Sequence, residues 1–208
     1  MDIMLDIETL GTEPGSVITQ IAAVQFDPVE GTLGKCLVLN VDIQSSLDLG
    51  MTVSGSTLSW WMLQSPETFK SISSEPKEKL PAALLRLSDF ILNSKLENIW
   101  GFGANFDITL LEVAYKKCNY ETLQAWKYPQ VSCLRTLTKY SRIQRPKFLS
   151  KEEYKALGLC SDIKDTEKVL ETVPVKHHAL WDAVLQAYWA LQILCPVELA
   201  VKNFKSNT

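Results

Sequence analysis

The sequence predicts an α/β fold in which a mixed β-sheet is covered by helices. Three strand-like segments come early in the chain, and helical and strand-like patterns then alternate, an order typical of such folds. The chain has 208 residues, of which 46% are hydrophobic, enough for a sizeable core in one compact domain. We therefore expect a single domain over residues 1–208, with a core from about residue 3 to residue 195 and a C-terminal tail at 196–208.

The three early strands are expected at 3–8, 16–26 and 37–43. The first is apolar apart from two carboxylates, and glycine and proline residues at positions 11, 14 and 15 separate it from the second. A glycine-bounded turn at 31–34 precedes the third. Strands at this spacing predict an antiparallel meander.

Helical patterns dominate the rest of the chain. Leucine and isoleucine recur at helical spacing over 80–96. An apolar stretch at 98–102, with Gly101 and Gly103 at its end, predicts a short strand. Residues 141–176 show no clear pattern. Further helices are expected at 56–63, 105–118 and 179–194, and at 134–140 after a segment that starts at Val131.

Charge and cysteine content narrow the class of protein. The net charge of −3 argues weakly against a DNA-binding module that relies on phosphate contacts alone. It leaves nucleic acid open as a substrate, because bound divalent cations can supply positive charge. Five widely spaced cysteines without a CxxC pair favour reduced thiols in a cytoplasmic protein and give no zinc signature. We expect neither a signal segment nor a membrane span, since no apolar run approaches about 20 residues.

Two carboxylates near the N-terminus are the first candidate site. Asp6 and Glu8 are two residues apart on an expected strand, so their side chains share one face. Burying both is costly unless a cation compensates them, and oxygen ligands suit Mg²⁺ or Mn²⁺. Taken alone, the pair is better explained by a strand end that emerges into solvent.

Three later residues extend this set. Asp107 follows a glycine-containing strand and falls in the first turn of an expected helix, where the helix dipole favours an ionised carboxylate; acidic residues are also common there for stability alone. His177 and Asp182 flank the start of the last helix. A histidine can accept a proton near neutral pH, although one at a helix entry is more often a cap or a surface residue.

Together these residues form an ordered set: D-x-E, then N-F-D, then H-x4-D. In this order and spacing the chain resembles the DEDDh exonucleases, the superfamily of ribonuclease T and the proofreading exonucleases, over roughly residues 3 to 195. The resemblance implies a ribonuclease H-like fold: a mixed five-stranded sheet, with three antiparallel N-terminal strands and then parallel strands, flanked by helices. It also implies a metal-dependent 3′→5′ exonuclease of the cytoplasm of a bacterium or a phage-infected host cell. Two Mg²⁺ or Mn²⁺ ions would be held by Asp6, Glu8, Asp107 and Asp182, with His177 as general base.

A narrower resemblance covers the segment LSWWMLQSPE at 58–67. It is similar to a branch that contains a bacteriophage exonuclease and the mycobacterial ribonuclease T-like enzymes. Trp60 and Trp61 either pack in the core or form a surface on which bases stack. Leu10 either wedges against the terminal base or is an ordinary core leucine. The substrate-binding residues implied by the family pattern are Thr9, Leu10, Gly11, Trp61, Asn105 and Phe106.

Several questions stay open at this stage. The expected partner is nucleic acid with a free 3′ end, and relatives suggest a homodimer. A catalytically silent nucleic-acid-binding module and a hydrolase of very short oligonucleotides are the alternatives. His178 gives the wrong spacing for the base, so we expect it to be structural or next to the substrate. A basic-rich stretch either tracks the substrate backbone or is a solvated surface; it contains Lys139, Arg142, Arg145, Lys147, Lys151 and Lys155.

Overall fold

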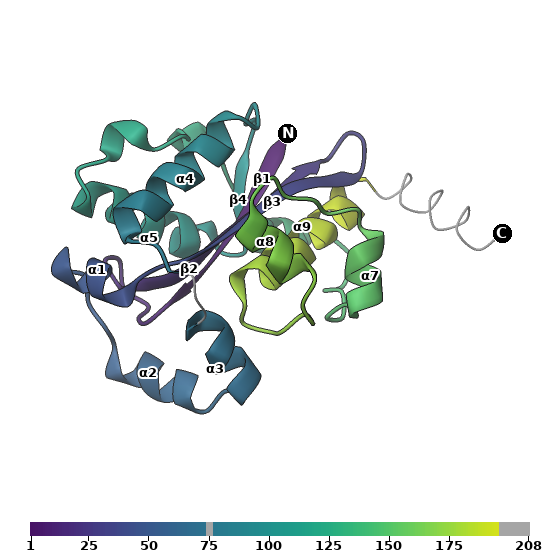
Figure 1. Cartoon of the computed structure of the whole chain (residues 1–208). Helices are drawn as coiled ribbons and strands as arrows, with labels where there is room; N and C mark the ends of the chain where they lie inside the picture. Colours follow the sequence, from purple (N-terminus) through teal and green to yellow (C-terminus); the bar gives the residue numbers. More distant parts are fainter. Residues whose placement is uncertain (74–76, 196–208) are drawn as a thin grey trace.

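The computed structural model describes residues 1–73 and 77–195, so the tail expected at 196–208 lies outside the described residues. A twisted sheet crosses the molecule, with α4 and α5 on one side and α7, α8 and α9 on the other (Figure 1). The sheet has five strands in the order β3-β2-β1-β4-β5. Its strands are β1 (Asp2–Thr9), β2 (Ile18–Asp27), β3 (Thr32–Asn40), β4 (Ile99–Gly101) and β5 (Val131–Cys133).

The pairing of the strands is mixed. β1 pairs antiparallel with β2, and β2 pairs antiparallel with β3. β1 pairs parallel with β4, and β4 pairs parallel with β5. This confirms the predicted five-stranded sheet, in which an antiparallel meander is followed by parallel strands. Because β1, β4 and β5 run in the same direction, their carboxyl ends meet at one edge of the sheet, where ligand sites of α/β sheets usually lie.

Helices cover both faces of the sheet. Three lie early in the chain: α1 (Ile43–Asp48), α2 (Gly55–Met62) and α3 (Pro66–Ser73). Two more form the cover of one face: α4 (Leu80–Leu92) and α5 (Ala104–Lys117). The others are α6 (Leu134–Tyr140), α7 (Lys151–Ala156), α8 (Lys164–Leu170) and α9 (Ala179–Leu194), with two 3-10 turns at Glu121–Leu123 and Tyr128–Gln130. In the described residues, none of the helices is long and apolar enough to cross a membrane.

Alternation along β1 divides the core into two layers. Ile3, Leu5 and Ile7 belong to the cluster that α4 and α5 complete. Met4 belongs to the cluster on the opposite face, which α9 completes. Asp6 and Glu8 share the face of Met4, so both carboxylates point toward α9 rather than into the purely apolar layer.

Some element boundaries differ from the predictions for local reasons. The third strand was expected at 37–43 but ends at Asn40, because the Asp42 carboxylate accepts hydrogen bonds from the backbone N–H groups of Gln44 and Ser45 and starts α1. The helix expected at 80–96 ends at Leu92. The chain then turns through Lys95, whose φ of 50° does not continue a right-handed helix.

The segment 141–176, which had no clear pattern, contains two short helices, α7 and α8. α7 begins with a capping box: Ser150 Oγ accepts from the backbone N–H of Glu153, and the Glu153 carboxylate accepts from the backbone N–H of Ser150. The loop before it is attached to α9 by Trp189, whose Nε1 donates to the carbonyl of Ile143 at 3.3 Å. Helices of six and seven residues are too short to give a strong periodic signal.

Candidate active site

Three carboxylates from the two ends of the chain converge beside β1. Asp6 and Glu8 come from β1, and Asp182 comes from the first turn of α9. One carboxylate oxygen of each lies within 4.8 Å of the other two. Two strand residues with a shared face and one residue on the helix that covers this face therefore form a group able to hold a cation.

Asp107 approaches the group from α5, where it lies in the first turn and is 5% exposed. β4 runs parallel to β1, and a sharp turn through Gly103, with φ at 102°, leads into α5. A Cβ at Gly101 would lie 3.1 Å from Oδ2 of Asp107. The carboxylate therefore occupies the space that a larger residue at position 101 would need.

The environment of the four carboxyl groups disfavours their ionised forms. Burial raises the pKa of Asp6 well above its usual range, and the nearby charges of Asp107 and Glu8 raise it further. Burial, followed by the charges of Asp182 and Asp107, likewise raises the pKa of Glu8. Burial raises the pKa of Asp107 to about 7 and also raises that of Asp182. Ionising the whole group therefore requires added positive charge.

Gln186 is a member of the site that the sequence analysis did not find. Its Nε2 donates to Oδ1 of Asp6 at 2.7 Å, which orients that carboxylate. Its Oε1 is buried and has no hydrogen-bond partner among the described residues. Gln186 lies four residues after Asp182, so it shares one face of α9 with this carboxylate. That spacing was the signal available in the sequence.

The two adjacent histidines have different environments. His177 has a φ of 59°, and its backbone N–H donates to Oδ2 of Asp182 at 2.9 Å. Its imidazole packs edge-to-face against Trp60, with ring centroids 5.0 Å apart and an interplanar angle of 82°. His178 is 7% exposed and caps α9, since its Nδ1 accepts from the backbone N–H of Leu180 at 3.2 Å. Burial lowers the pKa of His178 to about 4, so this histidine is a neutral structural residue.

A cavity of about 290 Å³ opens beside Glu8. We call it the aromatic cavity. Trp61 forms its floor: this side chain is buried, and its Nε1 donates to the carbonyl of Thr9 at 2.8 Å. Trp60 is 42% exposed and packs edge-to-face on Trp61 at 4.9 Å. The cavity is lined by Ile7, Glu8, Thr9, Thr12, Ser56, Thr57, Trp60, Trp61 and Phe106.

A second cavity, of about 540 Å³, opens beside Asp182 and His177. We call it the basic cavity. Three cationic side chains line it, from Arg145, Lys147 and Lys176. Its remaining lining residues are Pro146, Phe148 and Leu185. The carboxylate group thus has an aromatic cavity on the side of Glu8 and a basic cavity on the side of Asp182.

Comparison with known proteins decides the family. The model of the "3'-5' exoribonuclease Rv2179c-like domain" matches residues 1–194. The chain belongs to this family. This chain is also 24% identical over 122 residues to an exodeoxyribonuclease of Enterobacteria phage T4, a match that covers 53% of each chain. It therefore spans about half the length of this curated relative.

Solved structures confirm the predicted ribonuclease H-like fold of this chain. The zinc-bound ExoI–ssDNA complex of E. coli superposes with a TM-score of 0.58 at 17% identity, over 96% of this chain and 42% of that one. The nuclease domain of 3'hExo, a DEDDh family member bound to rAMP, superposes with a TM-score of 0.53 at 13% identity, over 94% and 92% of the two chains. At these identities, the matches show that this chain shares its fold with the two exonucleases.

Three of the six predicted substrate-binding residues of this chain line the aromatic cavity, and three do not. Thr9, Trp61 and Phe106 line the aromatic cavity. Leu10 is 6% exposed and belongs to the apolar core, so its environment is that of a core leucine. Gly11 is buried, and Asn105 is exposed in the first turn of α5.

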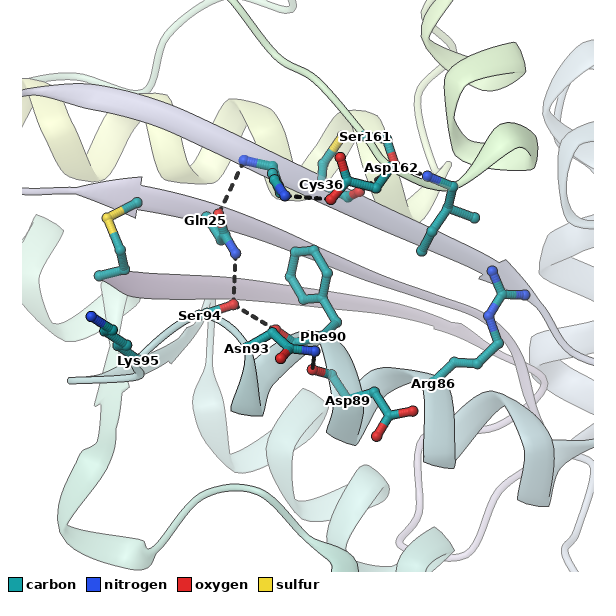
Figure 2. A pocket seen from close by; sticks show the side chains of 13 residues that line it. Gln25, Cys36, Arg86, Asp89, Phe90, Asn93, Ser94, Lys95, Ser161 and Asp162 are labelled. Atoms are coloured by element: carbon teal, nitrogen blue, oxygen red, sulfur yellow. Dashed lines mark hydrogen bonds and ion pairs between the residues drawn. The ribbon is translucent and has the colours of Figure 1, made fainter.

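Figure 2 shows a third cavity, of about 460 Å³, whose lining includes none of the four carboxylates of the site. Gln25 lines it and pairs with Ile3 near the start of β1, whereas the carboxylates lie near its end. Its polar groups largely satisfy one another: Lys35 pairs with Asp162, and Gln25 donates to Ser94 (Figure 2). This cavity contains none of the predicted site residues.

Proposed function

We propose that this chain is a metal-dependent 3′→5′ exonuclease that removes nucleotides one at a time from single-stranded DNA or RNA. The observation that carries the proposal is the convergence of four carboxylates and His177 beside an aromatic cavity. A family model of a 3'-5' exoribonuclease domain, matching residues 1–194, supports it. The products are nucleoside 5′-monophosphates and a strand shortened by one residue.

The carboxylate group fits divalent cations. Its ligand atoms are all carboxylate oxygens, which hard cations such as Mg²⁺ and Mn²⁺ prefer. Burial is the main cause of the raised pKa values of its members, and the charges of neighbouring carboxylates add to it at Asp6 and Glu8. Asp6, Glu8, Asp107 and Asp182 would hold two such ions. When bound, the ions supply positive charge that activates the attacking water and stabilises the leaving oxygen.

His177 acts as the general base. The hydrogen bond from its backbone to Asp182 and the contact with Trp60 place its imidazole at the edge of the carboxylate group. The imidazole takes a proton as the oxygen of water bonds to phosphorus. The bond from phosphorus to the 3′ oxygen breaks, this oxygen takes a proton from solvent water, and the shortened strand leaves with a 3′-hydroxyl.

The aromatic cavity receives the 3′-terminal nucleoside. It adjoins Glu8, and both Trp60 and Phe106 present ring surface to it. A base stacked on such a ring gains about 1–3 kcal/mol with little dependence on base identity. The carbonyl of Thr9 is already held by Trp61, so the backbone that borders the cavity is fixed before the substrate arrives.

The test is a length series of 5′-labelled RNA and DNA strands, incubated with Mg²⁺ or Mn²⁺ and resolved on a denaturing gel. Both polymers are needed because the family is described as exoribonucleases and the T4 relative as an exodeoxyribonuclease. We expect a ladder of products shortened from the 3′ end. EDTA and the variant Asp182→Asn should each abolish it.

Three other patterns would contradict the proposal. Binding of strands without any cleavage would favour a silent nucleic-acid-binding module. Cleavage confined to strands of two to four nucleotides would favour a hydrolase of very short oligonucleotides. Internal cuts in strands whose 3′ end is blocked would exclude an exonuclease altogether.

A further inference from the structure

The carboxylate group separates two cavities of different chemistry. Glu8 borders the aromatic cavity, and Asp182 borders the basic cavity. The residues that line the aromatic cavity include no lysine or arginine, whereas three cationic side chains line the basic cavity. We infer that the basic cavity binds the sugar-phosphate backbone of the strand on the 5′ side of the scissile phosphate. This inference rests on the proposed exonuclease function.

The direction of the strand follows from the two cavities. If the terminal nucleoside occupies the neutral, aromatic side, the scissile phosphate lies at the carboxylates and the rest of the strand must leave on the other side. Each further nucleotide adds one negative charge there. Arg145, Lys147 and Lys176 lie on this other side. Cationic side chains of this kind commonly contact the phosphates of a nucleic acid.

The positive charge of the basic cavity is available to a ligand. In residues 1–73 and 77–195, no salt bridge involves the side chain of Arg145, Lys147 or Lys176. All three side chains are exposed. By contrast, Lys35 in the third cavity is paired with Asp162. No salt bridge therefore fixes the cations of the basic cavity, although the charges of Arg145 and Lys176 act on Asp182 and partly offset the rise of its pKa on burial.

Arg145 is held in place before any ligand binds. Its guanidinium carbon lies 5.6 Å from the centre of the Phe102 ring, and Phe102 packs on Trp189 of α9 with ring centroids 5.6 Å apart. Trp189 also holds the same loop through its hydrogen bond to the carbonyl of Ile143. A guanidinium whose position is set by stacking loses less conformational entropy when it binds a phosphate.

A comparison of strands of different length tests the basic cavity separately from the carboxylate group. A dinucleotide has only the scissile phosphate, whereas an octanucleotide has further phosphates that reach the basic cavity. Loss of the cations should therefore weaken binding of long strands and leave binding of dinucleotides nearly unchanged. It should raise KM for long strands far more than KM for dinucleotides.

The experiment measures fluorescence anisotropy of 5′-labelled strands of two, four and eight nucleotides, with Ca²⁺ in place of Mg²⁺ and strand length checked on a gel. The variants are Arg145→Gln, which keeps a stem and polar tip without the charge, and Arg145→Gln combined with Lys147→Ala. Lys116→Ala is the matched control, since it removes one exposed cation at the far end of α5. Thermal unfolding checks that each variant is folded.

We expect the double variant to bind the octanucleotide about tenfold more weakly, and the dinucleotide less than twofold more weakly. The slope of log affinity against log salt should fall by about 1.4, since each phosphate contact with a single strand contributes about 0.7. Arg145→Lys should restore part of the affinity. Equal losses for both lengths, no loss, or the same loss in Lys116→Ala would overturn the inference.

Strand shortening in Mg²⁺ tests the proposed function separately. Wild-type protein that binds octanucleotides through Arg145 but shortens none of them would contradict the exonuclease and retain the basic cavity. If the wild-type protein shortens strands and Arg145→Gln has the same KM for octanucleotides as the wild type, the result would support the exonuclease and contradict the role of the basic cavity.

Discussion

Replacing Asp107 with Asn should stabilise the metal-free protein at alkaline pH. Burial raises the pKa of Asp107 to about 7 in the folded chain, from an ordinary value of 3.8. An acid with a raised pKa binds more protons when folded than when unfolded, so the free energy of unfolding falls as pH rises from about 4 to about 7. An amide of the same shape does not ionise and escapes this loss.

The magnitude follows from the shift. Raising the pKa of this carboxyl group by about three lowers the free energy of unfolding by on the order of 4 kcal/mol above pH 7. The variant gives up acceptor capacity toward the backbone N–H groups of Ile7 and of residue 107 itself, at about 1 kcal/mol each. The net gain at pH 8 is about 2 kcal/mol, which raises Tm by about 4–8 °C for a domain of this size. At pH 4.5 the wild-type carboxyl group is largely protonated in the folded chain, and the gain should vanish.

The assay is thermal unfolding, followed by circular dichroism, of metal-free wild type and Asp107→Asn at pH 4.5 and pH 8. Mg²⁺ or Mn²⁺ at pH 8 should reverse the order, because a ligand at 100 times its Kd stabilises the wild type by about 2.7 kcal/mol. The variant should respond less to metal. A variant that is no more stable than wild type at pH 8, or equally stabilised at both pH values, would refute the conclusion that the ionised Asp107 carboxylate destabilises the metal-free protein.

Other consequences concern residues around the carboxylates. His177→Ala should lower kcat at least a hundredfold with little change in Tm. His178→Ala should remove a helix cap, which lowers the free energy of unfolding by about 1 kcal/mol, and should retain catalysis. The reverse pattern of rates would invalidate the assignment of the base. Gln186→Met should weaken binding of Mn²⁺ about 10- to 100-fold by calorimetry, because it removes the hydrogen bond that orients Asp6; unchanged affinity would mean that the bond is unimportant. Trp60→Ala should lower kcat about tenfold as the imidazole of His177 loses its ring contact, and an effect on KM alone would assign Trp60 to substrate stacking only.

Local patterns predicted the first strands and the positions of the carboxylates on their elements, whereas the five-stranded sheet and the grouping of the carboxylates in one site came from the resemblance to a family. Period-two alternation on the first strand places Asp6 and Glu8 on one face, and the structure shows that this is the face toward α9. A buried strand, a glycine turn and a helix start predict Asp107 in a first turn, where it lies. These features depend on backbone geometry over a few residues, so the sequence carries them directly.

Contacts between distant segments could not be predicted from the sequence alone. Leu10 could equally have been a wedge or a core residue, and only packing put it in the core. The basic-rich stretch gave six candidates, but the attachment of its loop to Trp189 brings Arg145 and Lys147 to the cavity, while Lys151 donates to the carbonyl of Glu171.

The sequence by itself determined which residue types could hold metal, in what order they come, and on which elements they lie. Only the tertiary structure decided that Gln186 orients Asp6, that His178 is a cap while His177 faces Trp60, and that the carboxylates divide an aromatic cavity from a basic one. The reason is physical: side-chain direction follows from the local backbone, but the neighbours that a side chain meets depend on how whole helices and loops pack.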